Sequence, residues 1–172
     1  MNTPRTPLWR KTLRLVGYLL LALVLITAVD IYRWPDSRGL AHASFTTTRG
    51  EALDLHHTGK PVFLYFWGSW CGICRYTSPQ VQSLKNAGYP VASIAIGSGS
   101  DAGIHAYLQK HGWNFPVIND DSGELQTAFG IAAVPTIAIV QDGRIRLATS
   151  GWSSAWGLRA RYHLARLFPA AN

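Results

Sequence analysis

The hydrophobic residues of this chain fall into short runs, which polar and glycine-containing segments separate. The run Val62–Trp67 is apolar or aromatic throughout, as is typical of a strand buried on both faces. Residues 91–96 (VASIAI) predict a second strand of this kind. Between 102 and 111 the spacing becomes helical, with Ile104, Tyr107 and Leu108 on one face. The pattern predicts a domain that contains both strands and helices.

Turn and cap residues place the remaining elements. Asp142-Gly143 predicts a tight turn between strands at 136–140 and 144–149. Asp101 is expected to cap the helix at 102–111, and Ser122 is a candidate cap for the next one. The other expected elements are a hairpin at 45–55, a helix from the cysteines through Lys85, a strand at 115–118, a helix at 124–129 and a last helix capped by Ser153 or Ser154.

The last helix is expected to bury Trp156, Leu164 and Leu167 and to end before Pro169. Strands and helices that alternate and then close with a hairpin indicate one fold class. We predict an α/β fold, with a central mixed sheet flanked by helices on both faces.

Candidate chemistry lies directly after the first buried strand, where Cys71 and Cys74 form a Cys-x-x-Cys pair. At the start of a helix, unsatisfied N–H groups and a partial positive charge favour the thiolate of Cys71. A thiolate is the species that attacks a disulfide, and Cys74, one turn later, can resolve the mixed disulfide. The pattern therefore favours redox chemistry, with Cys71 as the more exposed sulfur and Trp70 as a shield against water.

Other interpretations of the pair stay open at this point. The pair can be half of a zinc site, although the chain has no further cysteines and histidines would have to complete the shell. It can also be an inert structural disulfide, which would stabilise little because it closes a very short loop. The third alternative is an incidental pair of reduced thiols.

Charge is distributed unevenly along the 172 residues. The formal net charge is +7, and Arg5, Arg10, Lys11 and Arg14 supply +4 of it before residue 15. The remaining 12 basic and 9 acidic residues leave only +3. The high charge is therefore not the footprint of a nucleic-acid-binding protein; much of it is a membrane-topology signal.

The uncharged run Leu15–Val29 follows those basic residues and predicts a single membrane anchor over 15–34. Residues 1–14 would then stay in the cytoplasm, 35–44 would form a linker, and 45–172 would form a domain beyond the membrane. We expect a single-pass protein of the inner membrane, with its catalytic domain in the periplasm. A cleaved signal peptide is the alternative.

Two motifs carry a resemblance to a known family. WCGIC, with Pro79 five residues after Cys74, resembles the active-site region of the thioredoxin superfamily. The segment FGIAAVPTIAIVQDGRI resembles the part of that superfamily that holds a cis-proline opposite the cysteines. The separation of 61 positions from Cys74 to Pro135 is similar to the central insertion of membrane-anchored TlpA/ResA-type thioredoxins. The CGIC pair and the short anchor resemble the ScsD (suppressor of copper sensitivity) branch.

The resemblance implies a thioredoxin fold with catalytic Cys71 and Cys74 and a cis bond before Pro135. It implies that the backbone of Val134 pairs with an extended substrate, and that Trp70 supports the site. The chain departs from the family at Tyr65, where many thioredoxins have a buried aspartate that helps proton transfer. We expect another group or water to take that role, and Glu124 is the candidate.

The expected activity is thiol–disulfide exchange with protein dithiols and disulfides, without a metal or an organic cofactor. The resemblance implies reduction of partner proteins, with electrons from a DsbD-like transmembrane protein and a link to copper stress. Cytochrome c maturation is the alternative client pathway. A copper-binding module or metallochaperone, with His56, His57 or His105 beside the cysteines, is the alternative of a different class.

Overall fold

The computed structural model describes residues 8–32, 34–41 and 45–167, and it divides the chain into two compact units. The first contains the helix α1 (Leu8–Tyr32), 25 residues long. Among the helices in the described ranges, none combines the length and the apolarity needed to cross a membrane. The second unit is the domain that contains the cysteines.

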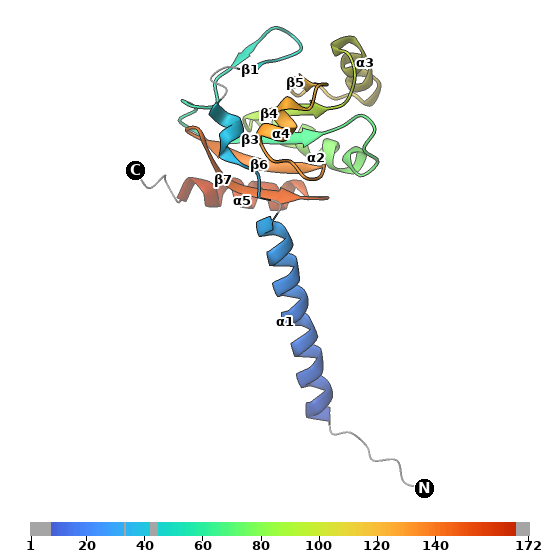
Figure 1. Ribbon diagram of the computed structural model, residues 1–172, viewed down its shortest axis with the longest axis vertical. Helices are drawn as coiled ribbons and strands as arrows, with labels where there is room; N and C mark the ends of the chain where they lie inside the picture. The colour runs from blue at the N-terminus through green and yellow to red at the C-terminus, as the bar shows by residue number, and fades with distance from the viewer. Residues whose placement is uncertain (1–7, 33, 42–44, 168–172) are drawn as a thin grey trace. The chain divides into compact units, whose positions relative to one another are not determined.

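The domain is built on a five-stranded mixed sheet over the described residues, in the order β5-β4-β3-β6-β7 (Figure 1). β3, β4 and β5 run parallel, whereas β6 is antiparallel to β3, and β7 to β6. The mixed sheet predicted from the sequence is thus confirmed. The strands are β3 (Val62–Trp67), β4 (Val91–Ile96), β5 (Val117–Asp120), β6 (Thr136–Gln141) and β7 (Arg144–Ser150).

Each face of the sheet carries its own hydrophobic cluster, because side chains of a strand alternate between the faces. Phe63, Tyr65 and Trp67 of β3 point to one cluster, which also holds both cysteines. Leu64 and Phe66 point to the other. The first cluster receives side chains from α2 (Cys74–Asn86), α3 (Asp101–His111) and α5 (Ala155–Leu167). The second is covered by η1 (Ser37–Ala41), α4 (Glu124–Ala128) and the hairpin β1 (Phe45–Thr46)–β2 (Ala52–Leu53).

Two helix starts differ from the predicted ones. Ser100, not Asp101, caps α3, since its hydroxyl accepts a hydrogen bond from the Gly103 N–H. Ser122 does not cap α4. Instead, the buried carboxylate of Asp120 accepts hydrogen bonds from the N–H groups of Leu125 and Gln126, at 3.0 and 2.7 Å. Asp120 is also the last residue of β5, so this strand lies two residues later than predicted.

The last helix buries a different face from the predicted one. Trp156, Leu164 and Leu167, all expected inside, are 80%, 44% and 73% exposed. Leu158, Tyr162 and Ala165 are buried in their place, with the i, i+4, i+7 spacing of a single helix face. Because α5 carries apolar residues on two faces, the sequence alone does not show which of them meets the sheet.

The linker predicted for residues 35–44 is wrong over its described part. Ser37–Ala41 forms the 3-10 helix η1, and Leu40 is only 1% exposed within the second cluster. The Asp36 N–H donates a hydrogen bond to the carbonyl of Phe129, and Gly39 lies directly against the Phe129 ring. The folded domain therefore begins before Phe45. Residues 42–44 lie outside the described residues.

We predict that Gly39→Ala destabilises the domain by about 1–3 kcal/mol, because an added methyl group would overlap the buried Phe129 ring. Chemical denaturation measures the effect. Gly103→Ala is the matched control, since a methyl group there would lie 3.5 Å from the Ser100 hydroxyl and should be tolerated in α3. Equal stabilities of the two variants would show that η1 does not pack against the domain.

Candidate active site

Cys71 and Cys74 lie where the central strand β3 leads into α2, and they are joined by a disulfide with their Cα atoms 5.3 Å apart. The Cys71 N–H donates to the carbonyl of Gly68 at 3.1 Å, and the Cys74 N–H faces the carbonyl of Cys71 at 3.2 Å. The first regular helical residue is Cys74. Cys71 therefore lies in the turn that precedes α2, three residues before the first residue of the helix.

Both cysteines are largely covered in this disulfide form. Cys71 is 5% exposed and Cys74 is 1% exposed, so Cys71 is the more accessible sulfur, as expected, but by a small margin. The Cys74 N–H also lies 3.2 Å from Sγ of Cys71 and donates to it. After reduction, the same donor would stabilise a thiolate on Cys71, because a hydrogen bond to the charged form favours that form.

The peptide bond between Val134 and Pro135 is cis, as the resemblance implied. The carbonyl oxygen of Val134 lies 3.8 Å from Sγ of Cys71, so two segments far apart in sequence meet at the sulfur. Gly151, the residue directly after β7, stabilises this turn, because its N–H donates a hydrogen bond to the carbonyl of Pro135 at 2.8 Å. Thr136 adds a second tie, because its hydroxyl donates to the carbonyl of Ala133 at 2.8 Å.

The Val134 N–H has no hydrogen-bond partner among the described residues, and Val134 is only partly buried. A free backbone donor beside a reactive sulfur can pair with the backbone of an extended peptide, as in strand addition. Val134 therefore offers a donor at the place where Cys71 would meet a substrate.

Tyr65 takes the position of the missing aspartate and ties β3 to α2. Its hydroxyl lies 3.0 Å from the Ser78 hydroxyl and 3.5 Å from the carbonyl of Cys74. Burial raises the pKa of Tyr65 far above that of an exposed tyrosine. The phenol therefore keeps its proton whenever the cysteines react. Tyr65 can orient the start of α2, but it cannot act as a base.

The predicted proton-transfer residue, Glu124, lies elsewhere in the domain. It is an exposed residue of the first turn of α4, and its neighbour Leu125 packs against the second cluster, on the sheet face opposite the cysteines. No contact within the described ranges joins Glu124 to Cys71 or Cys74. The geometry gives Glu124 no route to the resolving thiol.

Trp70 is fixed beside the pair but remains 63% exposed. Its indole N–H donates to the carbonyl of Ile96 at 2.9 Å, and its ring lies so close to Gly68 that any side chain there would overlap it. Gly68 therefore has to be glycine for the indole to lie at the end of β4. The ring forms an exposed wall of the site.

Sequence reasoning missed three exposed apolar side chains on the segments next to the cysteines and next to the residue that binds Pro135. Ile73 lies between the cysteines, Tyr76 follows in the first turn of α2, and Trp152 comes directly after the Gly151 that binds Pro135. They are 45%, 71% and 57% exposed. A sequence pattern normally predicts burial for such residues, so no signal in the chain distinguished them from core positions.

The histidines considered for copper make other contacts. His56 Nε2 contacts the carbonyl of Leu40, His57 Nδ1 lies 3.1 Å from Asp54, and His105 Nε2 lies 3.2 Å from the carbonyl of Thr48. In the described part of the chain, no group of three or more His, Cys, Asp or Glu residues has the arrangement of a metal site.

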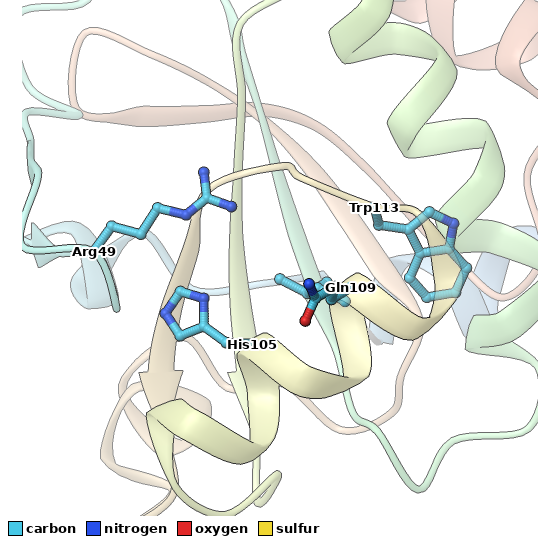
Figure 2. Close-up of a pocket in the computed structure, with 5 residues that line it drawn as sticks. Arg49, His105, Gln109 and Trp113 are labelled. Atoms are coloured by element: carbon cyan, nitrogen blue, oxygen red, sulfur yellow. The ribbon is translucent and has the colours of Figure 1, made fainter.

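His105 also lines a separate cavity of about 290 Å³ between the β1–β2 turn and α3 (Figure 2). Arg49 and His105 lie at one side of this cavity, Trp113 at the other, and Gln109 between them. Leu108 completes the lining. Neither cysteine lines this cavity, so it does not belong to the redox site.

Known proteins with similar sequences share the cysteine-containing domain. A thioredoxin-like protein of Haemophilus influenzae is 44% identical over 118 residues, which are 69% of each chain. The thiol-disulfide oxidoreductase ResA of Bacillus subtilis is 29% identical over 110 residues, 60% of this chain and 61% of ResA. The crystal structure of StoA from Bacillus subtilis matches with 25% identity and a TM-score of 0.60, and the match covers 68% of this chain and 92% of StoA.

The disulfide and these relatives together identify an oxidoreductase whose redox pair is Cys71–Cys74. The Redoxin family profile matches residues 34–154, which include the cysteines, the cis-proline and every strand from β1 to β7. The chain belongs to the Redoxin family.

Proposed function

We propose that this protein exchanges disulfides with partner proteins through the pair Cys71–Cys74. The observation that carries the proposal is the approach of Cys71 Sγ to the backbone of Val134, 3.8 Å away beside a cis-proline. A reactive sulfur and a free backbone donor at one place suit an extended peptide that carries a cysteine. ResA is named a thiol-disulfide oxidoreductase, which supports the same chemistry here.

In the reducing direction, the thiolate of Cys71 attacks one sulfur of a substrate disulfide. The substrate S–S bond breaks, a mixed disulfide forms, and the second substrate sulfur leaves as a thiolate. Cys74 then attacks Sγ of Cys71, which releases the first substrate sulfur and closes the Cys71–Cys74 disulfide. Two electrons pass to the substrate, and its two thiolates take up protons. The reverse sequence oxidises a substrate dithiol.

Proton transfer at Cys74 has to use water in this mechanism. Cys74 loses a proton before it attacks, and no carboxylate among the described residues contacts it. Tyr65, its polar neighbour, stays protonated because burial raises the pKa of the phenol. We infer that Tyr65 positions the start of α2 through the Cys74 carbonyl and the Ser78 hydroxyl rather than accepting the proton.

Substrate contacts extend beyond the backbone pairing at Val134. Ile73 lies between the cysteines, Tyr76 in the first turn of α2 and Trp152 directly after the Gly151 that binds Pro135, and all three side chains are exposed. These side chains suit a substrate with apolar residues next to its cysteine, since burying them on binding is favourable.

We further propose that the protein acts as a reductant on the far side of the inner membrane. The basic residues before residue 15 and the uncharged run Leu15–Val29 support an N-terminal anchor. A DsbD-like membrane protein would then return electrons to the Cys71–Cys74 disulfide. The likeness of the CGIC motif to the ScsD branch supports clients connected with copper stress.

We predict that Cys74→Ala traps partner proteins, because the mixed disulfide on Cys71 can no longer be resolved. Covalent adducts should accumulate on non-reducing gels and disappear with reductant. Cys71→Ala is the matched control and should trap no partner in this way. Both variants should lose the reduction of insulin disulfides. Wild-type protein without exchange activity, together with an empty Cys74→Ala lane, would refute the proposed function.

We predict that Tyr65→Phe lowers the free energy of unfolding by about 1 kcal/mol, through the lost hydrogen bond to Ser78. The variant should retain exchange activity, because Tyr65 is not a proton acceptor. An activity loss much larger than the stability loss would contradict this assignment.

The pH dependence of stability gives a second test of Tyr65. The phenol of the unfolded chain has the ordinary tyrosine pKa of 10.0, whereas burial raises the pKa in the folded protein and keeps the phenol protonated, so stability should fall as the pH rises above about 10. Below that pH both states hold the proton and the contribution is constant. Denaturation at a series of alkaline pH values should show a shallower fall in Tyr65→Phe. Tyr76→Phe removes an exposed phenol as the control.

We predict that the full chain stays with the membrane fraction after an alkaline wash and that a chain starting at Trp34 does not. Mass spectrometry of the mature N-terminus tests the same point. A product that begins near Val29 would show that the N-terminal segment is a cleaved signal peptide, not an anchor.

A further inference from the structure

Helix α5 presents an exposed apolar stripe, formed by Trp156, Leu164 and Leu167. Their spacing of eight and three residues places them on one side of the helix. The residues that α5 buries against the sheet, Leu158, Tyr162 and Ala165, lie on the other side. Large apolar side chains that recur along one uncovered helix face mark an interaction surface rather than scattered exposure.

The chain segment that carries the stripe is basic. All nine acidic residues of the chain lie at or before Asp142, so the segment from Gly143 onward contains none. That segment contains five arginines: Arg144, Arg146, Arg159, Arg161 and Arg166. By contrast, residues 15–142 contain seven basic and nine acidic residues. Arg161 and Arg166 are both exposed on α5, on the two sides of the stripe.

A cavity of about 200 Å³ lies between α5 and the edge strand β7, which run beside each other at one side of the domain (Figure 1). Leu147, Leu164 and Ala165 form its apolar lining, and Arg146 is its charged residue. Two guanidinium nitrogens of Arg146, Nε and Nη2, are buried without a hydrogen-bond partner in the described part of the domain. Leaving buried donors of a cation unsatisfied is unfavourable, so this cavity is suited to an anionic group.

We propose that α5 docks on an anionic phospholipid surface. Trp156, Leu164 and Leu167 enter the interface between headgroups and acyl chains, while a lipid phosphate is held at the Arg146 cavity. Tryptophan, leucine and flanking arginines are the combination that interfacial helices use. This binding is independent of the redox reaction and of the N-terminal segment.

The positive charge of α5 argues against a second copy of the chain as the partner of this face. Two copies of the chain meeting through this face would bring Arg161 and Arg166 of both copies together, and the segment from Gly143 onward supplies no acidic residue to pair with them. A headgroup phosphate supplies the missing negative charge, and acyl chains supply an apolar environment for the stripe. A lipid surface therefore satisfies both features at once, and a second copy does not.

The test uses residues 34–172. This part forms its own compact unit, and both of its hydrophobic clusters consist of its own residues. Co-sedimentation with phosphatidylglycerol-containing vesicles should show binding that falls as salt rises, whereas phosphatidylcholine vesicles should bind little. A blue shift of tryptophan emission on binding should be reduced in Trp156→Phe.

Variants assign the binding to this face. Trp156→Ser combined with Leu167→Ser should abolish it, and Arg161→Gln combined with Arg166→Gln should weaken it by roughly tenfold or more. Arg146→Gln tests the cavity and should also weaken it. Arg49→Gln combined with Lys110→Gln removes the same charge from another part of the domain and is the matched control. Insulin reduction by each variant checks that the fold is intact.

Several results would overturn the proposal. These are an absence of binding to the anionic vesicles, equal binding to both kinds of vesicle, or binding that the α5 variants leave unchanged. Sedimentation velocity tests the alternative that a second copy of the chain covers the stripe. Self-association that Trp156→Ser removes would assign the stripe to a second copy of the chain instead of a lipid surface.

Discussion

The structure of the site depends on the approach of one sulfur to one backbone carbonyl, Cys71 Sγ to Val134 O. The pairing of β3 with β6 creates this contact, because Phe66 near the end of β3 lies opposite Thr136 at the start of β6. The cysteines follow β3 and the cis-proline precedes β6, so the antiparallel register brings both to the same edge. A one-residue slip would turn every side chain of β6 to the other face. The pairing of the apolar strands β3 and β6 therefore determines how closely Cys71 approaches Val134.

The sequence predicted the parts of the fold that local chemistry determines. The continuous apolar runs of β3 and β4, the helical spacing of residues 102–111 and the Asp142-Gly143 turn each have one favourable structure, and the structure confirms them. The Cys-x-x-Cys motif and the segment around Pro135 likewise have few alternatives once they occur together.

The features that the sequence did not predict depend on contacts between distant segments. In the sequence, the serine- and glycine-containing stretch around Leu40 resembles a linker. Its contact with Phe129 in the structure shows that it belongs to the folded domain. The α4 cap comes from Asp120, four residues before the helix starts, because this buried carboxylate reaches two backbone N–H groups. The buried face of α5 was ambiguous because both faces are apolar. In each case tertiary packing chose between local alternatives of similar merit.

The stripe of α5 and the redox pair lie on helices that contact each other. The buried face of α5 packs into the cluster that contains both cysteines, and the Ala155 N–H donates to the side chain of Gln80 in α2. The helix that carries the stripe is therefore tied directly to the helix that carries Cys74. A lipid surface bound to α5 would fix the orientation of the disulfide relative to the membrane, not only its distance from it. A tether alone sets distance and leaves orientation free. If a membrane protein supplies the electrons, as proposed above, exchange needs both distance and orientation, and the second contact would raise the fraction of encounters in which Cys71 faces that donor.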